Sequence, residues 1–116
     1  MQITIPIRIQ SPNVTEHWRV KHKRNKLHAM LIRSELSKVA KPALPCTVTL
    51  TRRGVGQMDA DNCIYACKPA RDTIADWLLP GLAAGRADGD ERITWHYKQE
   101  QGYPYALIVE INSITS

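Results

Sequence analysis

Two aspartates one residue apart, Asp59 and Asp61, have the residue type and spacing in this chain that best fit chemistry. They follow a β-branched run and open a segment with helical periodicity. Two carboxylates held this closely can converge on one hard cation, because Mg²⁺ prefers oxygen ligands and keeps water or substrate oxygens in its shell. Aspartate is also favoured where a helix begins, because it caps free backbone N–H groups. The doublet therefore predicts either a metal site or a helix cap.

A lysine shares one face of the predicted helix with this doublet. At about 100° per residue, Lys68 falls in one polar sector with Asp61, Tyr65 and Asp72. The apolar positions fall opposite: Cys63, Ala66, Cys67, Ala70, Ile74, Trp77 and Leu78. Lys68 can neutralise the neighbouring carboxylates or contact a phosphate, and the spacing does not choose between these roles. Pro69 is expected either to bend this helix or to restart it at a first turn.

A second acidic turn, Asp88-Gly89-Asp90-Glu91, lies just before a predicted strand. Each of its three acids is a candidate ligand, and we choose Asp90 because of its distance from the following strand. Asp90 approaches the doublet only if the two strands that flank the helix are antiparallel neighbours. Under that condition Asp90 could approach Asp59 and Asp61.

Charge is divided unevenly along the chain. Residues 1–53 hold eleven Lys and Arg against two Glu, whereas residues 54–116 hold five against nine acidic residues. A basic region favours a polyanion, because neutralised phosphates release counterions. A solvated helix face is the alternative, but such a face normally carries both signs. The predicted phosphate contacts are Arg19, Lys21, Lys23, Arg24, Lys26, Arg52 and Arg53.

Length and composition limit the organisation. The chain has 116 residues and a mass of 13.1 kDa, which predicts a single domain over residues 1–116. No apolar run approaches the length of a membrane span, so we expect a soluble, cytoplasmic protein without a membrane partner. Three cysteines do not form a disulfide framework, and Cys63 and Cys67 are predicted to be buried. Their spacing does not suit zinc.

The hydrophobic pattern predicts an α/β (α+β) fold, a small mixed sheet packed with two helices in the order β-α-β-α-β-β. Pro6 in the first strand indicates a sheet edge or a bulge. Asn13 and Glu16 resemble a capping box that opens the long first helix. The expected strands are 3–9, 46–51, 93–98 and 105–111, and the expected helices are 14–40 and the segment from the doublet to about Leu79.

Together, the sequence Asp59-Ala60-Asp61-Asn62, the helical Lys68-Pro69 and the acidic turn before a strand resemble the RusA family of Holliday junction resolvases, many of which are carried by phages and prophages. The resemblance covers essentially the whole chain. It implies a Mg²⁺-dependent endodeoxyribonuclease, with Mn²⁺ as a substitute, that acts as a homodimer in DNA recombination and repair. Each subunit would nick one strand of a four-way junction, without a small-molecule cofactor.

The resemblance also implies roles for individual residues. Asp59, Asp61 and Asp90 correspond to the essential carboxylates that hold the metal. Lys68 corresponds to the family's lysine, which gives it a catalytic role in stabilising charge or orienting water. In the family pattern the lysine follows the second aspartate by four residues, where this chain has Tyr65. Lys68 lies seven residues on, and both spacings return to the same helix face.

Two other classes of protein fit parts of the sequence. A non-catalytic DNA-binding protein would use the acids as helix caps and as partners of Lys and Arg. A small-molecule metal hydrolase would explain the carboxylates but would leave the basic helix without a role.

Overall fold

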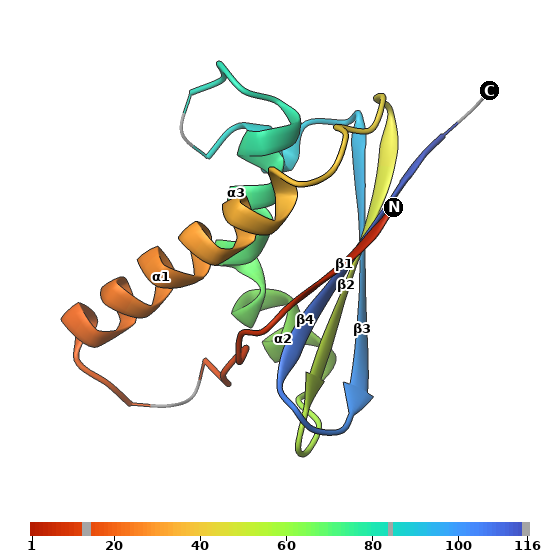
Figure 1. Ribbon diagram of the computed structural model, residues 1–116. Coiled ribbons are helices and arrows are strands. Elements are labelled where there is room, and N and C mark those ends of the chain that lie inside the picture. The colour runs from red at the N-terminus through yellow and green to blue at the C-terminus, as the bar shows by residue number, and fades with distance from the viewer. Residues whose placement is uncertain (13–14, 84, 115–116) are drawn as a thin grey trace.

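The computed structural model describes residues 1–12, 15–83 and 85–114. Four strands and three α-helices follow one another along this part of the chain (Figure 1). The elements are β1 (Gln2–Ile5), α1 (Trp18–Leu36), β2 (Cys46–Gly54), α2 (Ala60–Ala66), α3 (Lys68–Leu78), the 3₁₀ turn η1 (Ala87–Gly89), β3 (Ile93–Gln101) and β4 (Ala106–Ser113). Among the described helices, none is long and apolar enough to cross a membrane.

The four strands form one mixed sheet in the order β1-β4-β2-β3. Strand β4 is antiparallel to β1 and to β2, whereas β2 and β3 are parallel, with Cys46 opposite Ile93 and Gly54 opposite Gln101. Figure 1 shows the helices on one side of the sheet. The predicted α+β class with a mixed sheet is confirmed. The structure has three α-helices where two were expected.

The core lies between the helices and the covered face of the sheet. Strand β2 alternates buried and half-buried positions along its whole length, as a strand with one covered face does. Val48 and Leu50 of β2 pack with Val109 of β4 and with Ile74 of α3, and all four side chains are fully buried. The alternation of β2 agrees with the alternating pattern that predicts a strand over residues 46–51.

Strand β1 is shorter than predicted because of Pro6. Proline has no N–H for a sheet ladder, and the chain turns at this point, with the Ile7 N–H donating to the Ile5 carbonyl over 2.8 Å. The expected edge position is confirmed, since β1 is the outer strand beside β4. Ile7 and Ile9 remain buried beyond the end of the strand, so segment 6–12 lies against the core without being part of the sheet.

Helix α1 is also shorter than the predicted range 14–40. His17 is its N-cap, and the His17 Nδ1 atom accepts from the Arg19 N–H over 3.1 Å. The predicted cap residue Asn13 and the predicted start at Val14 lie outside the described residues. Only two α1 residues, Ile32 and Leu36, are buried. The first half of α1 therefore projects from the body of the molecule, as Figure 1 shows.

The segment predicted as one helix after the doublet consists of two. Pro69 lies in the first turn of α3, where a missing N–H costs no hydrogen bond, and the helix restarts at this proline. Cys67 joins α2 to α3 and is buried together with Cys63, as the sequence predicted. A hydrogen bond between the two thiols lowers the pKa of Cys63 to about 7 and raises the pKa of Cys67.

A buried arginine ties the end of β2 to the segment after β1. Arg52 is 7% exposed, and its guanidinium donates to the carbonyls of Ile9 over 3.1 Å and of Gly56 over 3.2 Å. Gly54 leaves the space for it, because a Cβ at this position would lie 2.9 Å from an Arg52 nitrogen. The neighbouring Arg53 points to the other face of the sheet, where its Nε pairs with Glu100 over 2.8 Å.

This arrangement predicts losses of stability of different size when either of two adjacent arginines is replaced. Arg52→Leu should lower the free energy of unfolding by about 2–3 kcal/mol, because the buried Ile9 carbonyl and the Gly56 carbonyl lose a charged donor. Arg53→Leu should lower it by less than about 1 kcal/mol, because an exposed ion pair contributes little. Urea denaturation of both variants measures the difference. Equal losses would contradict the interior role of Arg52.

Candidate functional site

The carboxylate doublet lies at the start of α2 and is exposed. Asp59 is the N-cap residue by backbone position, and its carbonyl accepts the Cys63 N–H over 2.9 Å, but its side chain makes no capping bond. Asp61 lies in the first turn. Among the described residues, neither carboxylate forms a hydrogen bond or an ion pair. The side chain of Asp59 is therefore not used as the cap that the sequence offered as an alternative.

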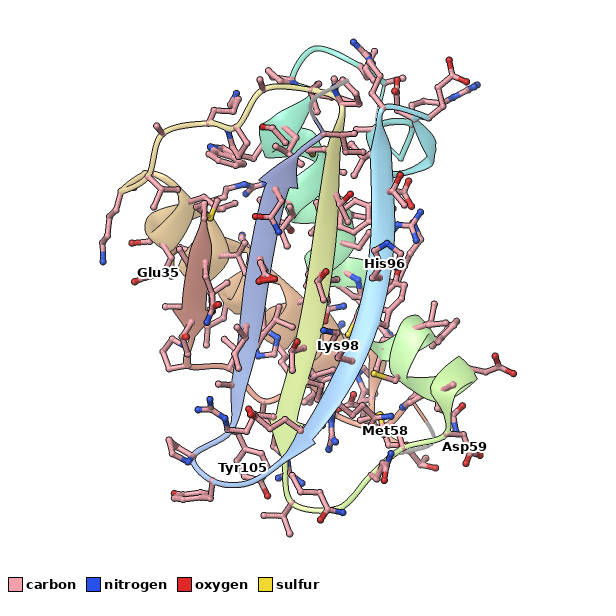
Figure 2. All side chains as sticks on the ribbon, turned by 90° about the vertical axis from the view of Figure 1, so that its right-hand side faces the viewer. Glu35, Met58, Asp59, His96, Lys98 and Tyr105 are labelled. Atoms are coloured by element: carbon pink, nitrogen blue, oxygen red, sulfur yellow. The ribbon has the colours of Figure 1, made fainter. Side chains whose placement is uncertain are left out.

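The backbone before the doublet is fixed by the end of β3. The side chain of Gln99 accepts the Met58 N–H over 2.9 Å and donates to the Met58 carbonyl over 2.7 Å. Figure 2 shows Met58 and Asp59 beside the end of β3, away from the end where that strand begins. Because Arg52 also holds Gly56, loop 55–58 is anchored at two points, and the doublet has a defined position.

Asp90 lies at the other end of the sheet. Its expected approach to the doublet required antiparallel neighbours, and β2 and β3 are parallel. The Asp90 carbonyl accepts the Ile93 N–H over 3.2 Å, at the beginning of β3. From Ile93 to Gln99 an extended strand covers about 20 Å. Since Mg²⁺ ligands lie about 2.1 Å from the ion, Asp90 and Asp59 of one chain do not share a cation.

The Asp90 side chain is instead bound within its own turn. It accepts from the Arg92 N–H over 2.9 Å and from the Arg92 guanidinium over 2.9 and 3.0 Å. These bonds from the side chain and backbone of Arg92 lower the pKa of Asp90 to about 2. Asp90 is therefore a charged carboxylate in a local ion pair.

Asp88 is the acid of this turn that faces the helices. Its carboxylate, 12% exposed, accepts from Lys68 Nζ over 2.6 Å and lies 3.3 Å from Arg71 Nε. The second contact has the distance of an ion pair but not the geometry of a hydrogen bond. Lys68 also donates to Asp72 over 2.7 Å, and bonds to Asp72 and Asp88 raise the pKa of Lys68. Of the two roles predicted for Lys68, charge neutralisation is the one that these contacts support.

Arg71 extends this network into the protein. It donates from Nη1 to the Tyr97 hydroxyl over 2.8 Å and from Nη2 to the Asp88 carbonyl over 2.7 Å. The indole of Trp95 donates to the same carbonyl over 3.0 Å, and the Arg71 guanidinium lies 4.7 Å from the Trp95 ring centroid. The turn before β3 is therefore held against α3 by side chains from α3 and β3.

Two hollows in the protein surface share the lining residues 8–11. The doublet cleft, of about 660 Å³, is lined by residues 8–11, 52, 55–59 and 62, so that Asp59 lies at its wall. The Tyr65 cavity, of about 380 Å³, is lined by residues 8–12, 16, 21, 24, 25, 28, 65, 66 and 68–70. Because Arg8 borders both hollows, a cationic side chain stands between the doublet and α1.

The basic residues predicted to contact phosphate divide into two groups. Lys21 and Arg24 of α1 line the Tyr65 cavity, and Arg24 is paired with Glu16 over 2.7 Å. Arg19, Lys23 and Lys26 are exposed on the same helix. Arg52 and Arg53 do not join them, because strand alternation sends the first into the core and the second to the opposite face.

Sequence reasoning missed one residue of these hollows, Arg8, and predicted His28 only as a polar surface residue or a phosphate donor. A signal for Arg8 was present, since it occupies an outward position in the alternating segment 3–9. His28 lines the Tyr65 cavity, where burial and then the charge of Arg24 lower its pKa. Both effects on the pKa of His28 favour the neutral form of its imidazole.

The described residues contain no group of three or more His, Cys, Asp or Glu side chains placed to hold one metal ion. Comparison of the chain with protein-family models, with curated proteins and with solved structures finds no match.

The acidic turn predicts different effects for two equivalent substitutions. Asp88→Asn should lower the free energy of unfolding by about 1–3 kcal/mol, because a half-buried acceptor of charged donors is weakened. Asp90→Asn should have a clearly smaller effect, since its side chain meets only Arg92 in an exposed turn. Thermal and urea unfolding at neutral pH compare the variants. A larger loss for Asp90→Asn would mean that Asp90, and not Asp88, holds the turn in place.

Proposed function

We propose that this protein is a Mg²⁺-dependent endonuclease that acts on branched DNA, with the four-way junction as the substrate that the RusA resemblance implies. The observation that carries the proposal is an unpaired carboxylate, Asp59, at a cleft that shares residues 8–11 with a basic hollow, with the unpaired Asp61 two residues further along the chain. Asp59 borders the doublet cleft, Arg8 borders both hollows, and Lys21 borders the second. A phosphate backbone held by these cations would pass the doublet.

The donor set of the doublet suits a hard divalent cation. Asp59 and Asp61 offer carboxylate oxygens one residue apart, and neither has a partner among the described residues. The adjacent Asn62 lines the same cleft and can donate or accept a hydrogen bond at its rim. A bound Mg²⁺ would supply a more acidic water and a polarised phosphoryl oxygen for phosphodiester hydrolysis.

The remaining side chains position the substrate. In this proposal Lys21, Arg8 and the exposed cations Arg19, Lys23 and Lys26 hold phosphates by sequence-independent attraction. Lys68, assigned a catalytic role in the sequence analysis, is shared by Asp72 and Asp88. Its role is instead to fix the turn before β3 against α3, which keeps the wall of the Tyr65 cavity in place.

A homodimer reconciles the resemblance with the separation of Asp90 from the doublet. In a two-fold dimer every contact occurs twice. If one end of the first copy contacts the other end of the second copy, the same two ends also meet with the copies exchanged. An antiparallel arrangement therefore brings the Asp90 end of each chain to the Asp59 end of its partner. In this proposal each metal group combines Asp59 and Asp61 of one copy with Asp90 of the other.

A non-catalytic DNA-binding protein is the second candidate. The contacts that favour it are those of the acidic turn, where Asp88 is satisfied by Lys68 and Asp90 by Arg92. This candidate predicts branched-DNA binding that does not change on addition of EDTA, and no cleavage with Mg²⁺ or Mn²⁺.

Substitution of the doublet tests the catalytic proposal. Asp59→Asn and Asp61→Asn should each reduce Mg²⁺-dependent cleavage of a synthetic four-way junction by at least about 100-fold, since one carboxylate of the metal group is lost. Binding to the junction without metal should be unchanged or tighter, because a negative charge near phosphate is removed. Asp76→Asn, an exposed aspartate of α3, is the matched control and should cleave normally. Retained cleavage in either doublet variant removes that residue from the site.

A mixing experiment tests whether the site is shared between two copies. Asp61→Asn and Asp90→Asn are each expected to be inactive, and co-refolding them should restore about a quarter of the wild-type sites, because half of the dimers are mixed and carry one intact site. Junction nicking per protomer measures the recovery.

The matched control mixes Asp59→Asn with Asp61→Asn, which break the same half of every site and should stay inactive together. An inactive Asp61→Asn and Asp90→Asn mixture rejects the shared site. Full activity of Asp90→Asn alone removes Asp90 from the metal group.

A further inference from the structure

The Tyr65 cavity has the size of a small-ligand site and a basic wall. Its volume of about 380 Å³ lies near the lower end of the range of about 300–1,000 Å³ typical of ligand pockets. It is bounded by the first half of α1, by segment 8–12 and by the joint of α2 with α3. Four cationic side chains and one acid, Glu16, contribute to this wall.

Only some of these cations are available to an anionic ligand. Arg24 is held by Glu16 through two contacts of 2.7 Å, and Lys68 is held by Asp72 and Asp88. Arg8 and Lys21 form no ion pair with an acid among the described residues. They lie over aromatic rings instead, Arg8 at 4.6 Å from the Tyr105 centroid and Lys21 at 5.9 Å from the Tyr65 centroid.

The same wall presents an aromatic ring that packs against no core. Tyr65 is 63% exposed, although it lies next to the half-buried Ala66 and close to the buried Cys67. An exposed ring beside available cations is the arrangement by which proteins hold unpaired nucleotides, with the base on the ring and the phosphate on the cations. A base inside a duplex cannot reach such a ring, because its faces are covered by its neighbours.

We propose that the Tyr65 cavity receives one unpaired nucleotide of a DNA strand, with the base stacked on Tyr65 and a phosphate bound by Lys21 and Arg8. This inference rests on the proposed function in one respect, the expectation that the nucleotide belongs to a branch point, where leaving the stack costs least. It assigns a specificity for unpaired DNA to a residue that the metal chemistry does not use.

Equilibrium binding without divalent metal tests the proposal. The probe is a short fluorescent single strand, compared with a blunt duplex of the same sequence by anisotropy. Tyr65→Ala should weaken single-strand binding about tenfold, and Tyr65→Phe should bind within about twofold of wild type, because stacking needs the ring and not the hydroxyl. Duplex binding should be the same in all three proteins.

Three outcomes would overturn the proposal. The first is equal weakening of single-strand and duplex binding in Tyr65→Ala, and the second is unchanged single-strand binding in that variant. The third is competition by a free deoxynucleoside monophosphate at the concentration at which the strand binds, which would make the cavity a site for free nucleotides. A thermal unfolding curve shows whether Tyr65→Ala folds as wild type, which its exposure leads us to expect.

The same measurements separate this inference from the proposed nuclease function. Binding is recorded without metal, so it does not depend on cleavage, and repeating it in the Asp61→Asn background should leave the Tyr65→Ala effect intact. A protein that discriminates unpaired DNA through Tyr65 but never cleaves would refute the nuclease and leave the cavity assignment standing. A protein that cleaves branched DNA but binds single strands equally well with Tyr65→Ala would support the nuclease and refute the cavity assignment.

Discussion

The parallel pairing of β2 with β3 determines where the candidate acidic residues lie. Parallel neighbours need a connection that returns from the end of one strand to the beginning of the next, and residues 55–92 provide it through α2 and α3 on the covered face. The doublet comes at the start of this connection and the acidic turn at its close. The two acidic segments are therefore separated by the length of the sheet in one chain, with Lys68 between them.

A second constraint is the burial of one cation, Arg52. Removing a guanidinium from water is costly unless its donors are satisfied. The acceptors of Arg52 are the backbone carbonyls of Ile9 and Gly56, in two segments far apart in sequence, and the Gln99 side chain. The side chain thereby joins segment 6–12 to the loop before the doublet. Both segments line the doublet cleft, so one interior arginine fixes the relative position of Arg8 and Asp59.

Much of the fold follows from local patterns in the sequence. Alternation identifies β2 and β4, the apolar sector after the doublet identifies the buried side of α2 and α3, and Pro69 and Pro6 mark a helix start and a strand end. Each of these signals depends on neighbouring residues only. The placement of Arg52 and Arg53 on opposite faces was also present in the strand alternation, although both were assigned to phosphate binding. Strand order could not be predicted in the same way, because a strand's own residues do not specify its neighbour. The expected approach of Asp90 to the doublet depended on that order and on the direction of β3.

The acids that form ion pairs can be compared with those of the doublet, which form none among the described residues. In the acidic half of the chain, Asp72 and Asp88 are neutralised by Lys68, Asp90 by Arg92 and Glu100 by Arg53. Asp59, Asp61, Asp76, Glu91 and Glu110 have no ion-pair partner among the described residues, and of these five acids only Asp59 lines the doublet cleft, together with Arg8 and Arg52. An unneutralised carboxylate repels a phosphate backbone that passes beside it, so the doublet cleft opposes DNA unless a divalent cation intervenes. The same charge that disfavours binding without metal makes a bound cation the link between this cleft and DNA.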